Sequence, residues 1–432
     1  MLCFRTEYFF MIDRYIKNSQ LSGIISLGIG TIIAQLINLI SQPLLTRLVT
    51  PEELGTYNFI ISMANLIIPI ASLKLIMLIV IDPDDEEAEI LTDVSIITAI
   101  IGSLLCTLFI AILLLIGNNA FSAIGYLSFL IPIIIITNAL RFIFISHNNR
   151  YKKYSLISKM DIFRELIKGV FQVTSGYLGG GAFGLSVGYA ASPTLGVKVQ
   201  ASDYINRFKY RKKIAFKTVL SIYKKKKDHI LYMVPAQFIN SFSFALLTYS
   251  IISLFSAEEL GYYSISYMVL GLPLVLISNN VSRVYLQNLK SLDQDGKSLW
   301  ENYKMIIKVL SLVSIIGFAI LALIAPKAAE MLFGEGYYQS GKYITILCFM
   351  FALRFIASSI IGGYVFFNKQ KFDTLFQIIL VLCGLFSHLL TALFSLNIYN
   401  YLCLISFTYG IVYLVIIINS GYICKKYDKN YN

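Results

Sequence analysis

Twelve long apolar stretches divide this chain and restrict it to a membrane-spanning fold. A helix needs about 20 apolar residues to cross the hydrocarbon core of a bilayer. In lipid, only helices and closed barrels satisfy their own backbone hydrogen bonds. The stretches cover residues 21–46, 56–80, 92–116, 122–146, 158–178, 180–199, 230–254, 260–285, 303–325, 341–366, 372–394 and 398–423. We therefore predict an all-α membrane protein of about twelve transmembrane helices. The sixth has the weakest pattern, because it is Gly-rich and interrupted by a proline.

Composition supports a membrane protein and gives little sign of a metal site. Charged residues make up 14% of the chain and hydrophobic residues 57%, whereas soluble domains carry about 25% charged residues. The three histidines and six scattered cysteines show no CxxC spacing, so we expect neither disulfides nor metal ligands. The first twenty residues lack the pattern of a cleaved signal. Translation starts at Met1 or at Met11.

The distribution of Lys and Arg predicts the orientation. With the N-terminus in the cytoplasm, 27 of the 36 Lys and Arg residues lie in, or within a few positions of, the cytoplasmic segments. This is the positive-inside bias, and it places both termini inside. The external loops are short and carry Glu. The acidic inner loop 82–89 departs from the trend, but Asp and Glu contribute little to orientation.

The two halves of the chain resemble each other. Ala34–Ser41 recurs as Ala236–Ser243, and Thr50–Tyr57 recurs as Ser256–Tyr263, at offsets of 202 and 206 positions. Six helices per half is an even number, so the halves are predicted to be parallel repeats about an axis along the membrane normal. The predicted parts are a cytoplasmic N-tail (1–20), an N-lobe (21–199), a cytoplasmic linker (200–229), a C-lobe (230–423) and a cytoplasmic C-tail (424–432).

The second repeated segment has the chemistry of a helix start. Thr50 and Ser256 are candidate N-caps, and Glu53 and Glu259 follow three residues later. This spacing is the capping box, in which the two side chains satisfy backbone N–H groups of the first turn. Pro51 suits the first helical position, where its missing N–H costs nothing. We expect these four residues to be structural.

The linker between the predicted lobes is strongly basic, with four consecutive lysines at 224–227. One interpretation is a topology determinant that lies against anionic lipid headgroups. The other is a binding site for a specific partner. The sequence leaves both open.

Several cations lie within the predicted spans, where charge is costly and usually faces a cavity. Arg354 lies near mid-depth in the tenth span, too deep to reach the surface easily. Lys74 lies about six residues from the inner end of the second span and is within reach of headgroups. Arg141 and Lys308 lie closer to the inner surface and suit snorkelling.

The fifth predicted span carries four charged residues on one face. Asp161, Arg164, Glu165 and Lys168 stand at positions i, i+3, i+4 and i+7. They form either one wall of a cationic cavity or an ion cluster that satisfies itself. His388, deep in the eleventh span, is either a proton relay or a hydrogen-bonded packing residue.

Uncharged polar strips begin each half. Gln35 and Asn38 share a helix face, and Gln237 and Asn240 repeat this arrangement. Such strips either hold helices together or line a polar cavity. The cations within spans outnumber the anions, which favours an anionic substrate such as a phosphate or pyrophosphate. No P-loop, HExxH or GxSxG motif supports an enzyme, and we expect no nucleic-acid partner.

Several segments are similar to those of a known family. Ser41–Arg47 followed by Thr50–Tyr57 resembles the opening signature of the polysaccharide-biosynthesis flippases, the Wzx-like O-antigen translocases. These belong to the MATE-like MOP exporter superfamily. Ile70–Lys74, Gly184–Tyr189 and Leu332–Tyr337 also resemble family segments. The resemblance runs from about residue 21 to the C-terminus.

The resemblance implies two six-helix lobes around a cationic cavity in the bacterial inner membrane. The implied substrate is an undecaprenyl-pyrophosphate-linked oligosaccharide, an O-antigen (lipopolysaccharide) or capsule repeat unit, flipped from the cytoplasmic to the periplasmic leaflet by alternating access. The implied partners are membrane lipids, a polysaccharide polymerase and a chain-length regulator. No cofactor is implied; coupling to H⁺ or Na⁺ is a family-level expectation, with Asp161, Glu165 and His388 as candidates. Relatives often carry Glu soon after the position of Lys74, whereas Ile76 and Met77 follow here.

Three other functions remain open at this stage. A MATE-like drug or cation antiporter needs acidic residues deep in the spans, and none lies beyond the cluster in the fifth span. A membrane glycan polymerase or ligase usually carries a large external loop, whereas every predicted external loop is short. A non-catalytic scaffold leaves the mid-membrane Arg354 without an explanation.

Overall fold

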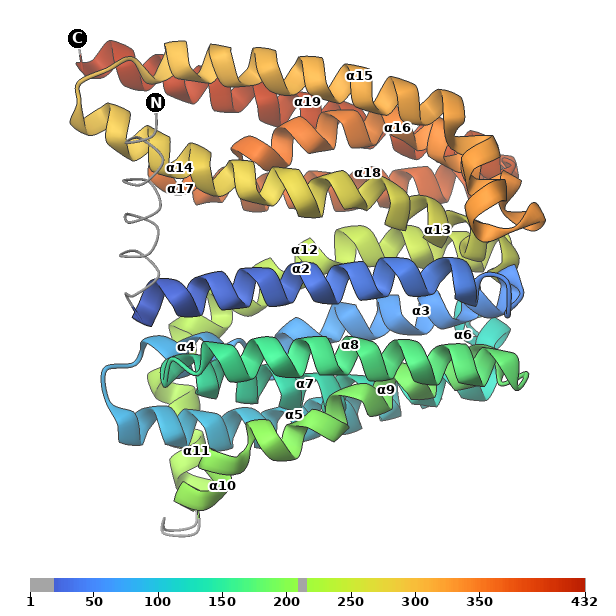
Figure 1. The fold of residues 1–432 in the computed structure, drawn as a ribbon, viewed down its shortest axis with the longest axis horizontal. Helices are drawn as coiled ribbons and strands as arrows, with labels where there is room; N and C mark the ends of the chain where they lie inside the picture. The colour runs from blue at the N-terminus through green and yellow to red at the C-terminus, as the bar shows by residue number, and fades with distance from the viewer. Residues whose placement is uncertain (1–18, 209–215, 432) are drawn as a thin grey trace, which may run out of the picture. The chain divides into compact units, whose positions relative to one another are not determined.

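The computed structural model describes residues 19–208 and 216–431, and within them it is all-helical (Figure 1). The helices of the first half are α2 (Ser19–Leu45), α3 (Pro51–Ile67), α4 (Leu75–Ile81), α5 (Asp85–Leu115), α6 (Asn119–Ile124), α7 (Leu130–Arg150), α8 (Tyr154–Tyr177), α9 (Gly181–Gln200), α10 (Ser202–Phe208) and α11 (Phe216–Lys225). Both possible start residues, most of the predicted N-tail and linker residues 209–215 lie outside the described residues.

The second half continues as helices joined by short turns. They are α12 (Lys227–Leu254), α13 (Ala257–Pro273), α14 (Asn279–Gln294), α15 (Leu299–Phe333), α16 (Tyr338–Ile360), α17 (Gly363–Phe366), α18 (Gln370–Phe394) and α19 (Ile398–Tyr431). A π-helical segment, Leu274–Ser278, joins α13 to α14.

The predicted all-α membrane fold is confirmed, and each of the twelve apolar stretches is mostly helical. Within the described residues, nine helices are long and apolar enough to cross a membrane, or ten if one bent pair counts as a span. Helix α8 carries the charged residues of the fifth stretch, and α9 is rich in Gly and Ser. Neither is among the nine, so the count of twelve spans stays a prediction.

The second predicted span is broken rather than continuous. Helix α3 and a 3-10 turn end at Ile70, α4 begins at Leu75, and the two parts are bent by 49°. Between them Leu73 and Lys74 adopt left-handed conformations with φ of 49° and 60°. Such conformations cost non-glycine residues about 1–3 kcal/mol each, so the surrounding structure must impose them. The predicted spanning helix over 56–80 is therefore interrupted at residues 71–74, where the sequence analysis expected continuous helix.

The chain forms two compact units. The first contains Met1–Val49 and Ile60–Phe238, and the second contains Thr50–Phe59 and Ile239–Asn432. Two helices, α3 and α12, therefore pass from one unit into the other. The exact lobe boundaries that the sequence predicts stay a prediction.

Small residues hold α2 against α8 in the first unit, where the two helices run side by side (Figure 1). A Cβ placed on Gly30 would lie 1.9 Å from Oγ of Ser158, and one on Gly169 would lie 2.8 Å from Oγ of Ser41. Small residues let membrane helices approach closely where no hydrophobic effect drives them together. This close packing holds the charged helix α8 against α2.

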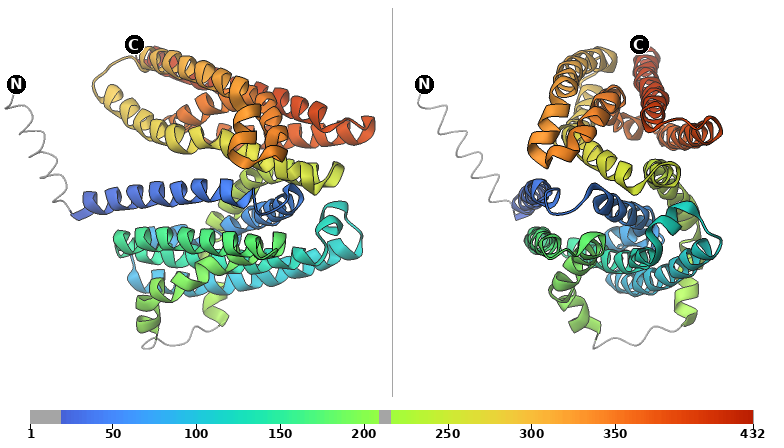
Figure 2. Two further views of the ribbon diagram at one scale, coloured as in Figure 1. Left: turned by 45° about the vertical axis from the view of Figure 1, so that its right-hand side comes forward. Right: turned by 90° about the vertical axis from the view of Figure 1, so that its right-hand side faces the viewer.

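In the second unit α16 packs against α13, α15 and α19 (Figures 1 and 2). Fully buried aromatic side chains fill this core, among them Tyr343, Phe351, Phe355 and Tyr409. Hydroxyl groups add interhelical bonds, such as that from Oγ of Ser314 on α15 to the carbonyl oxygen of Ala352 at 2.8 Å.

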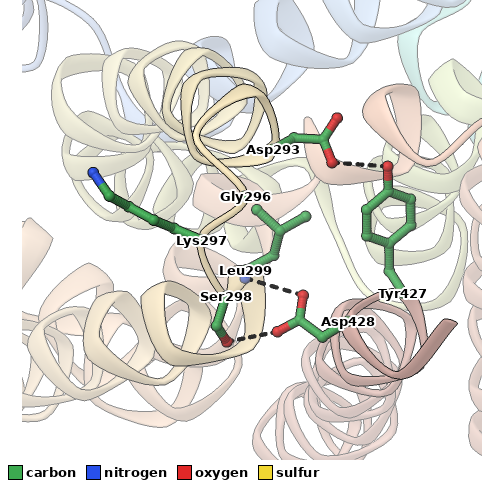
Figure 3. A pocket seen from close by; sticks show the side chains of 7 residues that line it. All are labelled: Asp293, Gly296, Lys297, Ser298, Leu299, Tyr427 and Asp428. Atoms are coloured by element: carbon green, nitrogen blue, oxygen red, sulfur yellow. Dashed lines mark hydrogen bonds between the residues drawn. The ribbon is translucent and has the colours of Figure 1, made fainter. Parts of the chain in front are cut away.

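The last helix of the chain caps another helix of the second unit (Figure 3). The Asp428 carboxylate on α19 accepts hydrogen bonds from Oγ of Ser298 at 2.6 Å and from the backbone N–H groups of Leu299 and Trp300 at 3.0 Å each. These N–H groups begin α15 and have no partner within their own helix. A carboxylate here also complements the helix dipole.

Candidate functional site

The charged residues of α8 form two ion-paired groups, one of which includes an arginine of a neighbouring helix. Nη2 of Arg141, on α7, lies 2.6 Å from Oδ1 of Asp161. Arg164 and Lys168 both pair with the Glu165 carboxylate. We call these five residues the α8 cluster. It contains three cations and two anions, so it retains one excess positive charge.

The α8 cluster is tightly enclosed. Nζ of Lys168 lies 3.2 Å from Oδ1 of Asn38 on α2, and its ammonium lies 5.9 Å from the ring centre of Tyr189. A pocket beside Arg141 and Arg164 has a volume of about 10 Å³, which is room for about one water molecule. In this conformation the cluster is enclosed and its charges are paired, but Nε of Arg141 and Nε of Arg164 have no hydrogen-bond partner among the described residues.

Arg354 is held differently, by aromatic rings instead of carboxylates. Its guanidinium lies 4.3 Å from the ring centre of Phe244, 5.4 Å from that of Phe351 and 5.7 Å from that of Tyr267. Nη1 also donates a hydrogen bond to the Tyr267 hydroxyl at 3.2 Å. Three helices, α12, α13 and α16, supply these rings. Within the described residues, no carboxylate pairs with this half-buried arginine.

The other predicted site residues lie in separate places. Lys74 lies at the break in the second span, where Nε2 of His229 donates to its carbonyl oxygen at 3.2 Å. His388 contacts Oγ of Ser250 through Nδ1 at 3.0 Å, which joins α18 to α12. Gln35 and Asn240 are exposed, and Gln237 is half-buried. Of the polar strips, Asn38 contacts the α8 cluster through Lys168.

The two candidate capping boxes differ from each other. Glu53 accepts from the Thr50 N–H at 2.8 Å, and Thr50 Oγ1 accepts from the Glu53 N–H at 3.2 Å. Ser256 Oγ accepts from the Glu259 N–H at 3.1 Å. The Glu259 carboxylate instead accepts a hydrogen bond from the buried Tyr343 hydroxyl. The first box has both reciprocal hydrogen bonds. In the second, the Glu259 carboxylate binds Tyr343 on α16 instead of the Ser256 N–H.

A buried polar layer at the end of α7 went unnoticed in the sequence. Nε2 of His147 lies 3.2 Å from the Glu89 carboxylate, which also accepts from the Tyr151 hydroxyl at 3.1 Å. Asp93 accepts a hydrogen bond from Tyr204. The sequence did hold one indication of this layer. A run of polar residues directly follows the apolar part of α7, and α5 begins with several acidic residues.

The basic linker pairs with the acidic inner loop. Nζ of Lys226 lies 3.0 Å from Asp82 and 2.8 Å from Glu87, and Lys225 also pairs with Glu87. Burial alone would raise the pKa of Asp82, but hydrogen bonds from Lys226 and from the Asp84 N–H hold that pKa below its usual range. At least these two lysines therefore neutralise the protein's own loop, an explanation that neither sequence interpretation contained.

Solved structures place the fold among helical membrane transporters. The lipid II flippase MurJ in an inward closed conformation aligns with a TM-score of 0.74 at 14% identity, over 92% of this chain and 87% of that one. An inward-facing multidrug resistance MATE family transporter of the MOP superfamily aligns with a TM-score of 0.56 at 14% identity, over 95% of this chain and 98% of that one. A MOP superfamily transporter from Pyrococcus furiosus aligns with a TM-score of 0.51 at 15% identity, over 94% of this chain and 96% of that one.

The fold is thus that of a multi-pass membrane protein, and it is shared with the MurJ and MATE structures. The chain belongs to the Polysaccharide biosynthesis protein family, whose model matches residues 44–342. An uncharacterized membrane protein in the cps region of Klebsiella pneumoniae is 24% identical over 254 residues, which are 57% of this chain. The matched part spans half the length of that relative. The family resemblance noted in the sequence is confirmed.

Proposed function

We propose that this protein flips an undecaprenyl-pyrophosphate-linked oligosaccharide, an O-antigen or capsule repeat unit, from the cytoplasmic to the periplasmic leaflet of a bacterial inner membrane. The family and the MurJ-like fold support a transporter of lipid-linked precursors. The proposal includes twelve spans in two lobes (21–199 and 230–423), cytoplasmic termini and alternating access. A polysaccharide polymerase and a chain-length regulator are the proposed partners.

Arg354 is the single observation that carries the substrate class. A half-buried guanidinium without a carboxylate partner among the described residues leaves most of its donors available. Arginine grips phosphate oxygens with paired hydrogen bonds. Aromatic rings attract the cation without neutralising it, so they hold Arg354 ready for an anionic diphosphate.

The remaining candidates have weaker support in this conformation. We assign Lys74, Arg141, Arg164, Lys168 and the polar strips (Gln35, Asn38, Gln237, Asn240) to the substrate path, where opening would expose them. Coupling to H⁺ or Na⁺ through Asp161, Glu165 or His388 belongs to the same proposal. Both carboxylates have cationic partners here, so coupling requires those pairs to break.

Deletion of the gene tests the proposal. Lipid-linked repeat units should accumulate on the inner leaflet, and surface polysaccharide should disappear. Arg354→Ala should reproduce the defect with normal amounts of protein in the membrane, and Arg354→Lys should restore export only in part, because lysine lacks the paired donors. Lys308→Ala, at an exposed span lysine, is the matched control. Unchanged lipid-linked pools after deletion would reject the flippase, and efflux of cationic dyes would then support the antiporter.

A further inference from the structure

The only tryptophan of the chain, Trp300, lies in the first turn of α15, which runs beside α19 in the second unit (Figure 1). Its ring stacks on that of Tyr303, with ring centres 5.6 Å apart and planes 13° from parallel. A Cβ placed on Gly421 of α19 would lie 2.7 Å from Cε1 of Tyr303 and 3.2 Å from Cζ3 of Trp300. Glycine therefore lets both rings lie directly on the α19 backbone. The Tyr303 hydroxyl also donates to the Ile417 carbonyl oxygen, which fixes the stacked pair between the two helices.

Two lysines from different helices surround this indole. Nζ of Lys304, one turn further along α15, lies 5.7 Å from the ring centre, and Nζ of Lys425 on α19 lies 5.8 Å from it. Glu301 pairs with Lys304 at 2.7 Å, whereas no carboxylate of the described residues pairs with Lys425. The neighbouring Asp428 carboxylate is taken up by the start of α15. Because an aromatic ring attracts a cation without neutralising it, an uncompensated positive charge stays beside the indole.

The indole lies at the depth where a lipid headgroup is expected. Trp300 precedes the predicted span 303–325 by three residues, and Lys425 follows the predicted span 398–423 by two. The hydrogen bonds from the α15 start to Asp428 bring these two helix ends together. Tryptophan and tyrosine prefer the boundary between hydrocarbon and water, and lysine side chains extend towards the headgroups. In the predicted orientation this boundary is the cytoplasmic one, where anionic lipids attract basic residues.

An exposed stripe leads from Lys425 into the predicted span of α19. Its members are Leu414, Ile418 and Tyr422. They precede Lys425 by eleven, seven and three positions, so they share one helix face with it. Such a stripe by itself indicates only contact with lipid tails. A cation and an indole at its end add a position for a headgroup, and a free phosphate would make no use of the apolar part.

We propose that Trp300, Lys304 and Lys425, which we call the Trp300 site, bind the headgroup of an anionic phospholipid such as phosphatidylglycerol. The lysine ammonium groups donate to the phosphodiester oxygens, the indole packs against the glycerol backbone, and an acyl chain follows the stripe on α19. The assignment to the cytoplasmic leaflet rests on the predicted orientation. The alternative is a purely structural role, in which the lysines only hold the ring between the two helices.

Fluorescence of Trp300 tests the site without any substitution, because no other tryptophan contributes to the signal. The full chain is reconstituted in phosphatidylcholine vesicles that contain a small fraction of bromine-labelled phosphatidylglycerol or, in parallel, of bromine-labelled phosphatidylcholine. Bromine quenches an indole only at close range. Half-maximal quenching should need an anionic fraction at least about fivefold lower than the neutral one, and high salt should reduce the difference. Equal quenching by the two lipids would overturn the site.

Neutralising a lysine separates binding from positioning. Lys425→Gln should raise the anionic fraction needed for half-maximal quenching about fivefold, whereas Lys425→Arg keeps the charge and should keep the preference. Lys290→Gln is the matched control, because it removes the same charge from an exposed position of α14. If Lys425→Gln weakened quenching by both lipids equally, the lysine would only position the ring, and the lipid site would be rejected.

Competition separates a phospholipid from a free anion. Inorganic phosphate should affect quenching by labelled phosphatidylglycerol no more than chloride does at the same ionic strength. Displacement by phosphate alone would identify a free-phosphate site and overturn the lipid. None of these measurements needs the transported substrate, so their outcome is independent of the deletion experiment. The Trp300 site would stand if the flippase were rejected, and the flippase would stand if both lipids quenched equally.

Discussion

The guanidinium of Arg150 donates a hydrogen bond to the carbonyl oxygen of Asp82 at 2.6 Å. The same nitrogen lies 3.0 Å from the carbonyl oxygen of Ile79. Nε and Nη2 both bind the Asp85 carboxylate, at 2.9 and 2.6 Å. One side chain thus satisfies carbonyls at the end of α4, which have no helical partner, and ties them to the start of α5.

We therefore expect Arg150→Ala to destabilise the first unit. Hydrogen bonds to charged groups contribute about 1.5–3 kcal/mol each, and the stranded carbonyls add to the loss. Thermal unfolding in detergent measures the effect. Lys159→Ala, at an exposed residue of α8, should leave the melting temperature unchanged. Equal melting temperatures for the two variants would show that Arg150 does not anchor α4.

The ion pair between Asp82 and Lys226 predicts a loss of stability in acid. The pKa of Asp82 is lower in the folded protein than its usual value. The pair therefore stabilises the fold above the unfolded pKa of about 3.9, and this stabilisation is lost as the pH falls through the folded pKa. Asp82→Asn should lower the melting temperature at neutral pH but not at the acid end. If the melting temperatures of Asp82→Asn and the native protein differed by the same amount from neutral to acid pH, the low pKa of Asp82 would not be the cause.

The close packing of α2 on α8 predicts a sharp penalty for bulk at Gly169. Gly169→Val must displace Ser41 and should cost about 1–3 kcal/mol by overpacking. Gly28→Val, on the partner helix α2, should be nearly neutral apart from helix propensity, because a Cβ there meets nothing within 4 Å. Unfolding in detergent compares the two. An unchanged stability of Gly169→Val would show that the close contact between α2 and α8 does not stabilise the protein.

The two glutamates of the repeated helix starts should differ in importance. Glu259→Ala leaves the donor of the buried Tyr343 hydroxyl unpaired, which costs about 1–3 kcal/mol. Glu53→Ala removes only an exposed hydrogen bond from the Thr50 N–H, which contributes about 0.5–1.5 kcal/mol. Adding Tyr343→Phe to Glu259→Ala should restore part of the stability, because it removes the unpaired hydroxyl. A double variant no more stable than Glu259→Ala would reject this explanation.

Apolar length predicted the helices because a lipid environment leaves the backbone few alternatives. The break at Leu73 and Lys74 escaped prediction, because neither residue favours a left-handed backbone and the conformation is imposed by tertiary contacts. The reduced apolar character of α9 was visible in its Gly and Ser content. The sequence could not decide whether that helix spans the membrane or packs only against its neighbours.

The candidate site was predictable along one helix and not between helices. The spacing from Asp161 to Lys168 placed four charges on one face of α8. The pairing of Asp161 with Arg141 depends on how α7 and α8 pack, which no local pattern records. The same limit hid the pairing of Lys226 with Asp82, which lies 144 positions earlier in the chain.

The cap that Asp428 provides has a consequence for biogenesis. Helix α15 begins at Leu299, but its first N–H groups acquire their carboxylate partner only from a residue near the end of the chain. The Ser298 side chain caps this helix start locally, through the Glu301 N–H, as soon as α15 forms. The carboxylate part of the cap is added only when α19 is made, because Asp428 follows Leu299 by 129 positions.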